Sequence, residues 1–427
     1  MAKTAEGPAT QTRRVEPGVW ASRTAALGPG ILMASAAIGG SHLISSTQAG
    51  ARFGWQLAFV IVVANLLKYP FFRFGPQYTV ESGRSLVEGY ARKGRGYLWV
   101  FFVLATVSSV ISTAGVGLLG AVILGFMLPD SWAPGIPALA TAMMASAWVL
   151  LVAGHYRALD AVTKVIIVTL TLATITATFM AASAGSERVA GFVEPTPWTW
   201  ATLPFLVALM GWMPAPIEIS ALNSLWIQAK QKLHPSRAKD VLFDFNVGYA
   251  TSAVLALFFL SLGALVQYGS GVEVATAGGA YVDQLLQMYG TAIGQWAVPL
   301  MAVIAFACMY GTVITVIDGY ARACAESLRL LRREPEFSRR SLNLWLSGIT
   351  GVGLVIVVAM SASLATMLTF AMISAFLTAP VFAWLNFSLV RGEGSLSPGL
   401  RYLSYAGLVY LAGFAALFLL DFVGLLG

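Results

Sequence analysis

The chain has 427 residues, of which 58% are hydrophobic and only 11% are charged, and its mean hydropathy is +0.76. Soluble domains carry about 25% charged residues, so this composition excludes a soluble protein and predicts a membrane protein. No phosphate-binding loop, nucleophile elbow or HExxH sequence occurs. We therefore expect no enzyme, no bound cofactor and no ATP-driven pump, and transport would have to use an existing gradient.

Eleven apolar segments approach or exceed the ~20 residues that a helix needs to cross a bilayer. They are expected at residues 27–53, 55–75, 98–128, 134–154, 159–184, 201–228, 243–268, 289–325, 343–361, 364–390 and 402–426. Residues 1–24 lack the apolar stretch of a signal peptide and are expected to form a disordered cytoplasmic leader. The predicted organisation is a five-helix unit at 25–185, a second at 200–391 and an eleventh helix at 400–427.

The basic residues predict the orientation. With the N-terminus in the cytoplasm, 24 of the 26 Lys and Arg residues fall on the cytoplasmic side, including Lys68 at the inner end of helix 2. Only Arg52 and Arg188 face outward, as the positive-inside rule requires. The net charge of +7 is thus a topology signal that predicts no nucleic-acid partner, and the C-terminus is expected outside.

Two of the apolar segments are interrupted near their middle. The first, GPGILMASAAIGGSHLISSTQAGARFG, runs from Gly28 to Gly54, and the second contains MPAP at Met213–Pro216. Interrupted helices in corresponding positions of two halves point to a transport site, because freed backbone groups are tolerated at membrane depth only where they line a cavity or a solute. Breaks in helices 1 and 6 predict an all-α, leucine-transporter-type fold with two inverted five-helix repeats plus an eleventh helix.

Three stretches resemble one family. GPGILMAS…AGARFGWQL, the MP pair in helix 6 and GTVITVIDGYARACAESL are similar to helices 1, 6 and 8 of the NRAMP divalent-metal transporters. The resemblance implies the leucine-transporter fold, a monomer, and proton-coupled uptake of manganese or iron, with the metal as substrate and not as cofactor.

The chain departs from that family at the metal site. The family's D-P-G-N sequence in helix 1 corresponds to Gly39, Gly40, Ser41 and His42, so its aspartate is missing. Met213 matches the family methionine, whereas Ala215 replaces the family histidine. Helix 3 also lacks acidic residues, which the family uses to relay protons.

The residues around the breaks nevertheless form a candidate cation site. A histidine nitrogen, a methionine sulfur and free carbonyls suit borderline ions such as manganese, iron, copper or zinc, so His42 and Met213 are the candidate metal ligands. Glu218 could supply the missing negative charge. The predicted substrate-binding set is Gly39, Gly40, Ser41, His42, Met213, Pro214, Ala215 and Glu218.

Four residues are candidates for proton transfer or gating: His42, Glu218, Asp318 and Arg322. His42 lies within a membrane span, and a histidine can exchange protons near physiological pH. These four residues and the candidate ligand Met213 also have structural interpretations. His42 could be a neutral, hydrogen-bonded imidazole, Met213 a core filler, Glu218 a cap of the inner half-helix, and Asp318 with Arg322 an i,i+4 salt bridge.

The sequence thus predicts a secondary active transporter of divalent transition metals that works by alternating access around a midplane site, and proton symport is a further expectation. The alternative is a transporter of the same fold that has lost metal binding and carries a small organic solute, which Trp212 could stack against. A non-transporting receptor is disfavoured because no signalling domain occurs. The expected location is a bacterial inner membrane, and the expected partners are the bilayer and the cargo.

Overall fold

The computed structural model describes residues 28–129, 131, 134–154, 156–185, 188–275, 278–392 and 396–425, with residues 156–164 and 278 described by backbone alone. The predicted leader, residues 1–24, lies outside this part. The first half contains α2 (Pro29–Ala37), η1 (Ser41–Ser46), α3 (Thr47–Phe53), α4 (Ala58–Ser82), α5 (Leu86–Lys93), α6 (Arg95–Phe126), α7 (Ile136–Ala153) and α8 (Tyr156–Ala184). The second half contains η2 (Trp200–Thr202), α9 (Leu203–Gly211), α10 (Ile219–Leu233), α11 (Ala238–Val266), α12 (Gly278–Ile293), α13 (Ala297–Arg332), α14 (Arg339–Ala359), α15 (Leu364–Val390) and α16 (Pro398–Phe422).

Nine helices in the described part of the chain are long and apolar enough to cross a membrane. The two remaining expected spans are the interrupted ones, formed by α2, η1 and α3 and by α9 and α10. The all-α architecture and both interruptions predicted from the sequence are therefore confirmed. The repeat limits at 25–185 and 200–391 stay a prediction.

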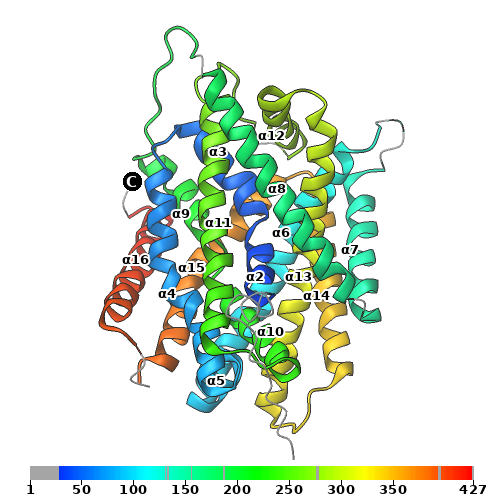
Figure 1. Cartoon of the computed structure of the whole chain (residues 1–427), viewed down its shortest axis with the longest axis vertical. Helices are drawn as coiled ribbons and strands as arrows, with labels where there is room; N and C mark the ends of the chain where they lie inside the picture. The colour runs from blue at the N-terminus through cyan, green and yellow to red at the C-terminus, as the bar shows by residue number, and fades with distance from the viewer. Residues whose placement is uncertain are drawn as a thin grey trace, which may run out of the picture.

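The two halves are built alike but point in opposite directions. Each has a broken first helix, and each places a short helix before its long third helix: α5 precedes α6, and α12 precedes α13. Figure 1 shows α5 and α12 at opposite ends of the bundle. This arrangement is that of an inverted repeat, and α16 lies at its edge.

One expected boundary was wrong. The sequence predicted a single eighth span at residues 289–325, but the structure ends α12 at Ile293 and begins α13 at Ala297. Gly294 separates them with a φ of 134°, which side chains other than hydrogen disfavour. The eighth span is therefore α13, which continues to Arg332.

The first broken helix lies in the middle of the bundle, and α11 packs along both of its halves (Figure 1). Glycines allow this close approach. A Cβ atom on Gly248 would lie 2.3 Å from the carbonyl oxygen of Gly30, and one on Gly50 would lie 1.9 Å from that of Leu260. Both distances are far inside van der Waals contact, so only glycine fits at Gly248 and Gly50. The contact fixes α2 and α3 against one straight helix on either side of the break.

Candidate functional site

The break in the first helix lies between Ala37 and Ser41. A helix end leaves carbonyl oxygens without partners, and these must be paired when they are buried. The Ser41 hydroxyl donates to the oxygen of Ala37 at 2.7 Å, and the Cys308 thiol donates to that of Ile38 at 3.1 Å. The Thr312 hydroxyl of α13 shares its one proton between the oxygen of Ser35 at 3.3 Å and that of Cys308 on its own helix at 3.0 Å. Neutral side chains therefore satisfy the carbonyls of this break.

At the break in the sixth span, the carbonyl oxygens accept hydrogen bonds from a charged side chain instead. The Nζ atom of Lys68, on α4, lies 3.0 Å from the carbonyl oxygens of Met210 and Gly211 and 2.9 Å from that of Ala215. The Lys68 side chain is fully buried. The expectation that Lys68 lies at the cytoplasmic end of its helix was wrong, because the carbonyls freed by the break hold its ammonium group inside the protein.

His42 lies in the π-helical turn η1 and is completely buried. Its Nε2 atom is 2.8 Å from the carbonyl oxygen of Ser252, and its Nδ1 atom is 2.8 Å from the Ser41 hydroxyl. A carbonyl only accepts hydrogen bonds, so Nε2 carries a proton and donates to Ser252. In the neutral ring Nδ1 is then an acceptor, so the single Ser41 proton is shared between Nδ1 and the Ala37 carbonyl oxygen.

A cavity of about 30 Å³ lies between the two breaks. A buried water molecule needs a cavity volume of roughly 10–15 Å³, so this cavity has space for about two water molecules. Four predicted substrate-binding residues line it, namely Gly40, Ser41, Pro214 and Ala215. The other four, Gly39, His42, Met213 and Glu218, are not among its lining residues. The described part of the chain also contains no group of three or more His, Cys, Asp or Glu residues placed to hold a metal.

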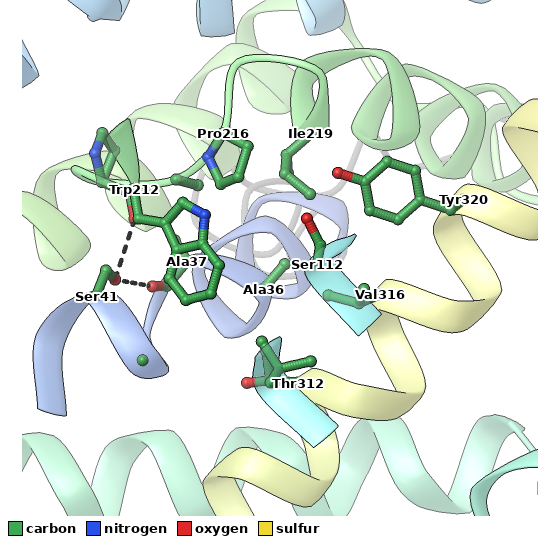
Figure 2. Close-up of a pocket in the computed structure, with 14 residues that line it drawn as sticks. Ala36, Ala37, Ser41, Ser112, Trp212, Pro216, Ile219, Thr312, Val316 and Tyr320 are labelled. Carbon is green, nitrogen blue, oxygen red and sulfur yellow. Dashed lines mark hydrogen bonds between the residues drawn. The ribbon is translucent and has the colours of Figure 1, made fainter. Parts of the chain in front are cut away.

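Other elements complete the wall of the cavity. Trp212 follows α9, Ser112 comes from α6, and Thr312 and Tyr320 come from α13. Figure 2 shows the Ser112 and Tyr320 hydroxyls and the Trp212 indole directed toward the same space. Thr312 and Tyr320 are eight residues apart on α13, which places them on one face of that helix. All the lining side chains are uncharged.

Three hydroxyl groups of the lining already donate their protons to protein acceptors. Ser41 donates to the Ala37 carbonyl as described, and Thr312 donates to the Cys308 carbonyl at 3.0 Å. Tyr320 donates to the carboxylate of Glu218 at 2.9 Å. A hydroxyl has one proton and two lone pairs. The lone pairs of these oxygens therefore remain for a cargo, which favours a cation.

Glu218 lies behind the cavity wall, one hydrogen bond from the lining through Tyr320. The residue is 1% exposed, and its Oε2 atom has no hydrogen-bond partner among the described residues. The Nε1 donor of Trp212 likewise has none. Glu218 is the N-cap residue of α10, but its side chain makes no capping hydrogen bond there. The cavity wall thus contains a buried donor, and a buried acceptor lies behind it, and neither has a hydrogen-bond partner in the described part of the chain.

Asp318 and Arg322 form the expected i,i+4 ion pair on α13, with 2.8 Å between the Arg322 Nε atom and the Asp318 carboxylate. Neither residue lines the cavity. Their role in gating stays a prediction.

Sequence reasoning missed Lys68 and Asp244 as residues that hold the broken helices. Asp244 lies on α11, and its carboxylate accepts hydrogen bonds from the backbone of Gly28 at 3.2 Å and Gly30 at 2.7 Å, at the start of α2. The signal for Lys68 was present in the sequence, since ionisable residues inside a span are costly and mark functional sites.

Comparison with known proteins agrees with this architecture. The family model for natural resistance-associated macrophage protein-like (Nramp) proteins matches residues 30–421. The chain belongs to the Nramp family. An uncharacterized protein of Pasteurella multocida is 50% identical to it over 97% of this chain and 96% of its own. The divalent metal cation transporter MntH of Latilactobacillus sakei is 23% identical over 67% of this chain and 63% of its own.

Solved structures show the same fold. A mutant of the manganese transporter of Eremococcus coleocola superposes with a TM-score of 0.73 at 14% identity, covering 99% of this chain and 91% of its own. Mhp1, a nucleobase-cation-symport-1 transporter with bromovinylhydantoin bound, gives 0.58 at 14% identity, covering 88% and 81%. Nramp family members are transporters and not enzymes, so the chain is a multi-pass membrane transporter of leucine-transporter fold.

Proposed function

We propose that the chain is a secondary active transporter of divalent transition-metal cations of the manganese type, and that it works by alternating access around the cavity between the two broken helices. The metal is cargo and not a cofactor. One observation carries this proposal: Ser41, Thr312 and Tyr320 give their protons to fixed acceptors, so oxygen lone pairs are left for the cargo. Relatives named as divalent-metal and manganese transporters support the choice of cargo.

The donor set differs from the one that the sequence suggested. His42 and Met213 predicted a soft-to-borderline site, whereas the cavity presents hydroxyl oxygens with Glu218 behind them. Oxygen ligands suit manganese better than copper or zinc. We propose that Glu218 supplies the negative charge that the site otherwise lacks, through its unpartnered Oε2 atom or through Tyr320.

A second cargo is favoured by a different observation. The indole N–H of Trp212 is buried, lines the cavity and has no acceptor among the described residues. A bare metal ion offers no acceptor to an N–H group, whereas a small organic solute with a carbonyl or carboxylate does. A water molecule bound to a metal ion also accepts from it. The second candidate is therefore a transporter of a small organic solute.

The proposal also covers the membrane location, the orientation and the oligomeric state. We propose a bacterial plasma-membrane protein with a cytoplasmic N-terminus and an external C-terminus, which acts as a monomer. The distribution of Lys and Arg supports this orientation. Proton symport is part of the proposal, with Glu218, which accepts a hydrogen bond from the cavity-lining Tyr320, as the titratable group that connects to the cavity.

Flux into proteoliposomes tests the proposal. Liposomes that contain the protein and a metal-quenched dye are exposed to Mn²⁺, with protein-free liposomes as the control. We expect quenching well above the control. The absence of quenching by several divalent ions would contradict metal transport and favour the organic solute, which uptake of labelled carboxylate or amide solutes would then test.

A further inference from the structure

The carbonyl oxygens at the end of α9 form a complete cation-binding group. Met210 and Gly211 belong to the last turn of α9, and Ala215 follows in the break. The Met210 oxygen accepts only from the N–H groups of the break itself, such as that of Met213 at 3.4 Å, and the oxygens of Gly211 and Ala215 are left for other donors. The C-terminal end of a helix also carries the negative end of its dipole. In transporters with broken helices, such half-helix ends and unwound carbonyls bind the coupling cation. In this chain the position is already occupied.

Lys68 fills this position completely. Its ammonium group has three N–H donors, and three carbonyl oxygens lie 2.9–3.0 Å away, one for each donor. A neutral amine has only two N–H donors and could not satisfy all three oxygens. The side chain is fully buried, and its charge interacts with that of Glu218 across the break.

We propose that Lys68 is a tethered cation that occupies the monovalent-cation site of the second helix break, so that the carrier takes no free coupling cation there. The ammonium is attached to α4 through the Lys68 side chain, so it cannot exchange with cations in solution. Alkali cations therefore have no vacant site at Met210, Gly211 and Ala215. The inference goes beyond the proposed function, because it concerns a site separate from the cargo cavity.

Chemical rescue tests the proposal without relying on transport. Lys68→Ala removes three carbon atoms and the ammonium, which n-propylammonium matches in size and charge. We expect Lys68→Ala to lower the apparent Tm of the purified protein by about 5 °C or more. We expect n-propylammonium chloride to restore at least half of that loss. Tetramethylammonium, which has no N–H donor, should restore none, and the wild-type protein should respond to neither salt.

Two further variants make the test complete. Lys68→Met keeps the length of the side chain and removes its donors, so we expect a lower Tm with no rescue, because the methionine fills the space. Lys93 is the control, since its Nζ atom also donates to a backbone carbonyl, that of Ser388, but lies outside the breaks. Lys93→Ala should show no response to n-propylammonium.

Several results would overturn the proposal. These are a Lys68→Ala protein as stable as the wild type, equal rescue by tetramethylammonium, or n-propylammonium stabilisation of the wild type. The wild-type chain gives an independent result even if both Lys68 variants fail to fold. Its Mn²⁺ flux should be the same in sodium, potassium and N-methylglucamine buffers, and a requirement for sodium or potassium would contradict a filled site. A wild-type protein with no Mn²⁺ flux would refute the proposed cargo, while the rescue experiment would still decide the role of Lys68.

Discussion

The Nε2 atom of His42 donates a 2.8 Å hydrogen bond to the carbonyl oxygen of Ser252, and this bond joins the π-helical turn η1 to α11. The interaction places the only described histidine of the membrane spans against a neighbouring helix and outside the lining of the cavity. A proton-exchange role for His42 would require the ring to leave Ser252 during transport. Structural and proton-transfer roles therefore predict different behaviour.

We predict that His42 stabilises the break and does not set the pH dependence of transport. His42→Ala leaves the Ser252 carbonyl buried without a donor, which costs about 1–3 kcal/mol of unfolding free energy. His42→Gln keeps an N–H donor and should recover most of this loss. Both variants should show the wild-type pH profile of Mn²⁺ flux. A flattened profile in both would instead support the proton link that the sequence suggested.

Glu218 is the residue on which metal transport should depend most. Glu218→Gln keeps the size of the side chain but removes its charge, and hydrogen bonds to charged groups are worth about 1.5–3 kcal/mol. We predict at least a ~10-fold loss of Mn²⁺ flux, because 1.4 kcal/mol corresponds to a factor of ten. Proteoliposome flux measures the effect.

Tyr320→Phe provides the control for Glu218→Gln. It removes the hydroxyl that connects Glu218 to the cavity but leaves the carboxylate in place. We expect an intermediate loss of flux. Wild-type flux in Glu218→Gln would contradict the proposed role of the carboxylate.

Trp212 separates the two candidate cargoes. Trp212→Phe keeps an aromatic ring in the wall and removes the unpartnered N–H donor. If the cargo is a metal ion, flux should fall less than about threefold, because only a contact to bound water is lost. For an organic solute that accepts from the indole, we expect a loss of about tenfold or more, since a buried acceptor would lose its donor. Flux of Mn²⁺ and of the candidate solutes should be measured on the same preparations.

The glycine contacts between α11 and the broken helix should tolerate no side chain. Gly50→Ala would place a methyl group 1.9 Å from the carbonyl oxygen of Leu260. We predict a loss of more than ~1–3 kcal/mol, the usual cost of overpacking a core, because the obstacle here is backbone. Gly413→Ala is the control, since a Cβ atom there meets nothing within 4 Å. Thermal unfolding of both variants checks the prediction, and equal Tm values would contradict the close packing.

Much of the fold followed from the sequence for a physical reason. Glycine and proline disrupt helices, so Gly39 to His42 and Met213 to Pro216 marked both interruptions within a few residues of their positions in the structure. Membrane thickness fixed the length of the remaining spans. The split at Gly294 was missed because the last turn of α12 and the start of α13 read as one largely apolar run from residue 289 onward.

The composition of the site was less predictable. Which side chain pairs a freed carbonyl depends on how neighbouring helices are rotated, and the sequence does not specify those rotations. Lys68 was therefore assigned to the membrane boundary, although three carbonyls hold it at the second break. Thr312 and Tyr320 could have been predicted from the sequence, because their spacing places them on one face of a helix that resembles the family's eighth helix.

Anomalous diffraction at the manganese edge, from crystals grown with MnCl₂, would test metal binding between the two breaks most directly. We expect an anomalous peak in the cavity, among the oxygens of Ser41, Thr312 and Tyr320. Peaks confined to the protein surface, or no peak at a Mn²⁺ concentration that supports flux, would contradict a metal cargo bound at this site.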